Sequence, residues 1–132
     1  MSANSPNDLR TPRAKVRGLG SAKDGTGHFI AQRVTAIAMV PLGIALVAAI
    51  ISQLGADHES FKSFMGNPLI AVGFLLLIFT GTYHMRLGMQ VVIEDYVHTE
   101  IRKVLALLAS TFFAIVVAAV AGFSVLKLAL GA

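Results

Sequence analysis

The sequence predicts an all-α membrane protein with three transmembrane helices. Of its 132 residues, 55% are hydrophobic and only 14% are charged, which is too apolar for an ordinary soluble domain. Three stretches contain no Asp, Glu, Lys or Arg: Val34 to Ala56, Pro68 to Met85 and Val104 to Leu126. At about 1.5 Å per residue, each can cross a hydrocarbon core roughly 30 Å thick. With their flanks, the expected spans are 29–54, 68–95 and 104–128.

The basic residues predict how the helices are oriented in the membrane. The loop after the first span has one Lys against two acidic residues, whereas the loop after the second carries Arg102 and Lys103. Cytoplasmic segments are enriched in Lys and Arg, so the N-terminus is expected in the cytoplasm and the C-terminus on the far side. Six basic residues precede or open the first span: Arg10, Arg13, Lys15, Arg17, Lys23 and Arg33.

The chain divides into a polar cytoplasmic segment, 1–27, and a three-helix transmembrane domain, 28–132. The segment lacks an apolar core before a cleavage site and therefore does not read as a secretory signal peptide. Asp8 and Asp24 argue against a transit peptide. We expect a multi-pass protein of the bacterial inner membrane, surrounded by lipid. The net charge of +4 then reflects topology rather than nucleic-acid binding, and the lack of cysteine excludes disulfides and thiolate ligands.

Each span carries a local signal. In the first, Pro41 with Gly43 shortly after it can bend a membrane helix. Gly66-Asn67-Pro68 predicts the start of the second, because it supplies a turn, a capping side chain and a proline at the first helical position. The third span is almost wholly aliphatic, and we assign it to packing and lipid contact.

His84 is the most informative residue of the second span. Leu77, Gly81, Gly88, Val91 and Asp95 lie within about 60° of it on one helix face. Ionisable residues inside a membrane are costly to insert and are functional by default. Glycines beside the imidazole would make room for a flat group, so the pattern favours an axial haem ligand near mid-membrane. A histidine that merely hydrogen-bonds across a helix interface is the alternative that stays open.

Arg86 points roughly opposite to His84, so the two cannot share a contact. It can snorkel, pair with a carboxylate of a partner or stabilise a charged cofactor group. Asp95 and Tyr96 end the helix near the cytoplasmic surface. A tyrosine hydroxyl suits a quinone carbonyl and a nearby carboxylate can relay a proton. On position alone, however, an interfacial aromatic belt is the favoured explanation of the tyrosine.

The pattern His84, Gly88 and Asp95-Tyr96-Val97 resembles the small hydrophobic membrane anchor subunits of succinate dehydrogenase, respiratory complex II. Gln32-Arg33-Val34-Thr35-Ala36 at the opening of the first span adds to the resemblance, which covers most of the chain after about Gly20. The resemblance implies a non-catalytic anchor subunit of a complex that works in the respiratory chain and the tricarboxylic acid cycle.

The resemblance also implies roles for single residues. His84 would be an axial, metal-binding ligand of haem b, with the second ligand supplied by the large cytochrome b anchor subunit. Tyr96 would hydrogen-bond ubiquinone, with Asp95 beside it. Arg33 would lie near the haem propionates, and His28 is near a family histidine. Arg86 departs from the family pattern, which has an apolar or aromatic residue there.

The implied partners include an iron–sulfur subunit that delivers electrons and a flavoprotein subunit that oxidises succinate. Three alternatives stay open. The first is an anchor of a fumarate reductase, and the second is a small proton-relay or transport subunit that uses His84, Arg86 and Asp95. The third is a purely structural anchor in which these groups pair with partner helices.

Overall fold

A computed structural model describes residues 11–13 and 24–131 of the chain. Its helices are α2 (Asp24–Ile51), α3 (His58–Met65), α4 (Pro68–Tyr96) and α5 (Glu100–Ala129). Three of them are long and apolar enough to cross a membrane, over Gly25–Ile51, Pro68–Tyr96 and Glu100–Ala129. The predicted all-α fold with three membrane-spanning helices is therefore confirmed. Most of the predicted polar segment 1–27 lies outside the described residues, and its last residues already belong to α2.

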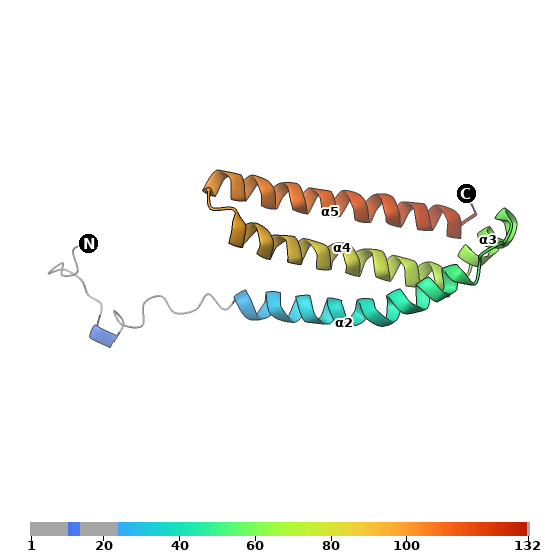
Figure 1. The fold of residues 1–132 in the computed structure, drawn as a ribbon, viewed down its shortest axis with the longest axis horizontal. Coiled ribbons are helices and arrows are strands. Elements are labelled where there is room, and N and C mark those ends of the chain that lie inside the picture. The colour runs from blue at the N-terminus through green and yellow to red at the C-terminus, as the bar shows by residue number, and fades with distance from the viewer. Residues whose placement is uncertain (1–10, 14–23, 132) are drawn as a thin grey trace.

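The central helix of the fold is α4. It packs against α2 on one side and α5 on the other, whereas α2 and α5 do not contact each other in the part of the chain that is described. Figure 1 shows the three long helices side by side in one layer, with α3 at the end where α2 leads into α4. Because α4 has a neighbour on two sides, its side chains can find partners on two opposite faces.

The interior of this layer is thin and apolar. Few side chains are buried, and no polar or charged side chain among the described residues is. Large apolar side chains cover much of the outside, which suits lipid as the surrounding solvent. The buried side chains are Leu46, Met65, Ala71, Leu87, Ile93, Ala114 and Val125.

The local signals at the helix ends behave as the sequence predicts. Asn67 caps α4, because its side-chain oxygen accepts a hydrogen bond from the backbone N–H of Leu69 at 2.9 Å. Pro68 occupies the first turn, where no amide hydrogen is needed. The first long helix continues through Pro41, and in Figure 1 its second half curves toward α3.

The short helix α3 was not predicted from the sequence, which indicated only a loop. Its start is built by Asp57, whose side chain accepts a hydrogen bond from the N–H of Ser60 at 2.9 Å. Its end contributes Met65 to a small apolar cluster with Ala71 of α4 and Val125 of α5. The cluster ties α3 to the ends of both transmembrane helices.

The cap of α3 makes its order depend on pH. Hydrogen bonds from Ser60 lower the pKa of Asp57 from its usual 3.8, so the ionised carboxylate is the form that the folded helix prefers. The ionised Asp57 therefore stabilises the folded helix fully above pH 3.8, the usual pKa. This stabilisation is lost as the pH falls through the lowered pKa of the folded state.

We therefore expect the amide hydrogen of Ser60 to exchange faster with solvent as the pH falls below this range, after correction for the intrinsic exchange rate. Asp57→Asn keeps a capping oxygen that does not titrate and should abolish this dependence. An unchanged dependence in Asp57→Asn would contradict the assignment of the cap. The measurement is hydrogen exchange followed by mass spectrometry or NMR.

Candidate functional site

The imidazole of His84 lies at the contact between α4 and α2. Its Nδ1 is 2.9 Å from Oγ1 of Thr35, a residue of α2 that is 49 positions away in the chain. Both side chains are partly buried. The face of α4 that the sequence analysis singled out is therefore the face that packs on α2.

The hydroxyl of Thr35 bears on which nitrogen of His84 carries the proton. Its oxygen lies 2.7 Å from the carbonyl oxygen of Ala31 and 3.1 Å from that of Gln32. The single hydroxyl hydrogen of Thr35 has its shortest contact with the carbonyl oxygen of Ala31, which can only accept. We infer that the hydroxyl oxygen accepts from His84, which places the imidazole hydrogen on Nδ1. The lone pair of Nε2 stays free, and Nε2 has no hydrogen-bond partner among the described residues.

A groove of about 430 Å³ lies one turn along the same interface. Its walls include His28, Gln32 and Arg33 of α2 and Gly88 and Val91 of α4. Nε2 of His28 and Oε1 of Gln32 are buried without a hydrogen-bond partner. Orphaned polar atoms of this kind are rare in proteins, because each costs free energy to desolvate. The groove therefore has the chemistry of a site that a polar ligand group would complete.

Arg33 lies at this groove with its guanidinium carbon 5.0 Å from the centre of the Phe29 ring. The cation–π contact holds the positive charge beside the groove while leaving its N–H groups available. His28, Arg33 and Gly88, which the sequence analysis treated as separate candidates, thus line one site. Their common location is a finding of the structure and could not be read from their spacing.

The glycines on this face lie against α2. A Cβ atom added to Gly88 would be 3.6 Å from Nε2 of Gln32, and one added to Gly81 would be 3.8 Å from the terminal methyl group of Met39. Both distances are ordinary van der Waals contacts. In this chain the glycines therefore allow close packing of α2 on α4, and the room beside them is the groove at Gly88.

Asp95 and Tyr96 lie at the end of α4, one turn beyond Val91 of the groove. Both are exposed, and Tyr96 exposes 77% of its surface. Neither makes a side-chain hydrogen bond with another described residue. The phenol and the carboxylate are therefore both free to meet a ligand or a partner at this end of the helix.

Arg86 lies on the opposite face of α4, as predicted. Its Nε donates to Oγ1 of Thr111 on α5 at 3.3 Å. The assignment of the third span to packing and lipid contact alone is therefore wrong for Thr111. The signal for this contact was a polar residue, Thr111, on a mostly aliphatic helix. Thr35 likewise had no role assigned from the sequence.

Metal-binding groups do not cluster in the described part of the chain. Among residues 11–13 and 24–131, no three His, Cys, Asp or Glu side chains are clustered to hold a metal ion.

The fold and the site define a class of protein: a multi-pass membrane protein that presents one histidine and a polar groove on a central helix. Residues 7–122 match the family described as the succinate dehydrogenase/fumarate reductase transmembrane subunit. The chain belongs to this family.

Similar proteins are named succinate dehydrogenase hydrophobic membrane anchor subunit. The one from Paracoccus denitrificans is 32% identical over 122 residues, which cover 92% of this chain and 94% of the relative. The one from Rickettsia bellii (strain RML369-C) is 36% identical over 90 residues, covering 68% and 72% of the two chains. No solved structure matches the chain significantly. Membership of this family agrees with the predicted multi-pass location in a bacterial inner membrane.

The proton on His84 can be tested without any cofactor. We expect the native chain in micelles to carry the imidazole proton on Nδ1. Thr35→Val removes the accepting oxygen, and the ring should then lose its preference for this tautomer. The measurement is the ¹⁵N shift of the two ring nitrogens, assigned with His84→Gln.

Thr82→Val is the matched control, because the hydroxyl of Thr82 bonds only backbone carbonyl oxygens of its own helix. It should leave the His84 signals unchanged. A native chain with the proton on Nε2 would show that the assignment is wrong.

Proposed function

We propose that this chain is the membrane anchor subunit of a succinate dehydrogenase, that it helps bind haem b, and that it forms part of the site where ubiquinone is reduced. It would not be catalytic on its own. The observation that carries the proposal is the state of His84: Thr35 occupies its Nδ1 and leaves Nε2 free, beside a groove with two orphaned polar atoms.

The residues present fit a haem group. A metal-binding histidine usually donates its second ring N–H to an oxygen, which fixes the tautomer and the ring orientation. Thr35 supplies that oxygen for His84. Arg33 would place a positive charge beside the propionates, and the orphaned nitrogen of His28 could donate to them. When bound, haem b would supply a one-electron redox centre.

The second axial ligand would come from the large cytochrome b anchor subunit. The single layer of α2, α4 and α5 supports this arrangement, because its broad faces are open to a partner. The iron–sulfur and flavoprotein subunits would dock on the cytoplasmic side, where the positive-inside rule puts the ends of α4 and α5 that carry Tyr96 and Glu100.

Ubiquinone would bind at the end of α4. The Tyr96 hydroxyl can donate a hydrogen bond to a quinone carbonyl, and the adjacent Asp95 carboxylate can hold a proton for transfer. Exposure of both groups supports this role, since a ligand or partner surface must complete their surroundings.

Two alternatives from the sequence can be weighed against this proposal. A proton relay through His84 and Arg86 is disfavoured, because His84 contacts α2 and Arg86 contacts α5, on opposite faces of α4. An anchor of a fumarate reductase falls within the same family description. We favour succinate dehydrogenase because the relatives carry that name.

The quinone role is tested with Tyr96→Phe in the assembled complex. Loss of the hydroxyl should reduce succinate:ubiquinone reductase activity by about tenfold or more, because a positioned donor is removed. Succinate oxidation with a soluble artificial electron acceptor should be unchanged, since it does not need the quinone site.

Tyr83→Phe is the matched control, because it removes the same hydroxyl from another exposed position on α4. It should leave both activities near the native level. Full quinone reductase activity in Tyr96→Phe would contradict the proposal, and so would an equal loss in both variants.

A further inference from the structure

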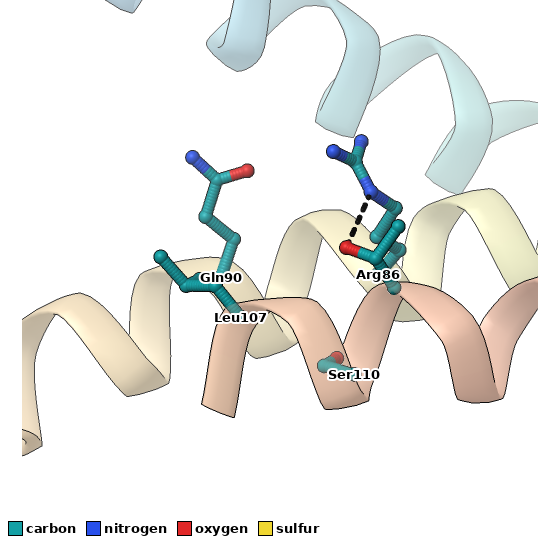
Figure 2. Close-up of a pocket in the computed structure, with 5 residues that line it drawn as sticks. Arg86, Gln90, Leu107 and Ser110 are labelled. Atoms are coloured by element: carbon teal, nitrogen blue, oxygen red, sulfur yellow. Dashed lines mark hydrogen bonds between the residues drawn. The ribbon is translucent and has the colours of Figure 1, made fainter. Parts of the chain in front are cut away.

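Arg86 lies in a small polar pocket between α4 and α5. The pocket has a volume of about 140 Å³ and is lined by Arg86, Gln90, Leu107, Ser110 and Thr111. Figure 2 shows the side chains of Arg86 and Gln90 on the same side of α4, with the two terminal guanidinium nitrogens extending beyond the bond to Thr111. This pocket has no part in the haem and quinone site described above.

The pocket lies deep in the membrane. Arg86 precedes Tyr96 by ten residues, and Thr111 follows Glu100 by eleven residues. At about 1.5 Å per residue, both lie about 15 Å or more from the ends of their helices. Because the guanidinium bonds a residue at its own depth, it does not snorkel toward the membrane surface.

The charge of Arg86 is not compensated. Its partner Thr111 is neutral, and it forms no ion pair with any described residue. Gln90 is neutral as well, and its amide donates to Glu94 near the end of the helix at 2.9 Å. A guanidinium inside a membrane is costly without a counter-charge, so the pocket is incomplete as it stands.

The described part of this chain holds no acidic residue at the depth of Arg86. Its acidic residues lie in the α3 region or near the ends of the long helices: Asp24, Asp57, Glu59, Glu94, Asp95 and Glu100. The described residues of a second copy could therefore not provide a carboxylate there in either orientation. A lipid phosphate belongs at the membrane surface, about 15 Å away along the helix.

We propose that the pocket is the docking site for an Asp or Glu side chain on a transmembrane helix of a different subunit. Two terminal nitrogens of the guanidinium can bind a carboxylate in the two-pronged geometry that makes such pairs strong. Ser110 and Thr111 line the same pocket, and the hydrogen of neither hydroxyl has an acceptor among the described residues. The pocket would then select both the partner helix and its depth.

This inference does not depend on haem or quinone. His84 and its groove lie on the α2 side of α4, whereas the pocket lies on the α5 side. Failure of haem binding would therefore leave the docking proposal standing, and failure of docking would leave the assignment of His84 intact.

The first test maps the occupant in the native complex. A photo-reactive diazirine amino acid replaces Leu107 of the pocket, and the same group at Phe112, which is 64% exposed, serves as the control. After illumination, mass spectrometry should find an adduct from Leu107 on a partner transmembrane helix with an Asp or Glu within one turn of the attachment point.

Three outcomes would overturn the proposal. One is an adduct on a helix without an acidic residue at that depth. The second is an adduct with lipid only. The third is no adduct above the Phe112 control, as a water-filled pocket would give.

The second test changes the charge of Arg86 and measures how much of the partner subunit stays bound. The complex is purified through a tag on this chain, and the ratio of the crosslinked subunit to this chain is quantified. Arg86→Gln should lower the ratio roughly tenfold after washing, because it leaves the carboxylate unpaired. Arg86→Glu should lower it further, and Arg86→Lys should retain most of the partner.

Arg102→Gln is the matched control, since Arg102 is exposed at the start of α5. It should retain the native ratio. Helix content from circular dichroism distinguishes loss of docking from loss of folding. A native ratio in a folded Arg86→Glu variant would contradict the proposal.

Discussion

Hydrocarbon offers no hydrogen-bond partner, so a polar side chain in a membrane helix needs one on a neighbouring helix or in a bound molecule. The hydrogen bond between Thr35 and His84 is the interaction on which this account depends. It joins α2 to α4, and we infer that it places the proton on Nδ1, with the hydrogen of Thr35 donated to a backbone carbonyl. One hydroxyl group thus occupies one ring nitrogen, and the other has no hydrogen-bond partner among the described residues.

The position of α4 between two helices separates two kinds of chemistry. The α2 side carries the imidazole and the groove with orphaned atoms of His28 and Gln32. The α5 side carries Arg86 and its pocket. Each side is incomplete in a different way, since one lacks a partner for polar atoms and the other lacks a negative charge. A small subunit that completes its polar groups only within a complex would have this character.

The sequence predicted what depends on local chemistry or helical periodicity. The start of α4 follows from Asn67 and Pro68, and the opposite directions of His84 and Arg86 follow from about 100° per residue. The contacts with Thr35 and Thr111 could not be predicted, because they depend on how separate helices are rotated against each other. Helices that are apolar all round give little indication of that rotation. The short helix α3 was not predicted, because the charges of this segment were used only for topology and the capping role of Asp57 was not considered.

The most direct test of the central claim is a reduced-minus-oxidised visible spectrum of the purified native complex, compared with His84→Ala and with His98→Ala. His98 is exposed beyond the end of α4, so its loss should not affect a buried haem. The account predicts a b-type haem signal in the native complex and in His98→Ala, and a lost or altered signal in His84→Ala. An intact native complex without such a signal, or a signal that His84→Ala leaves unchanged, would contradict the assignment of His84 as a haem ligand.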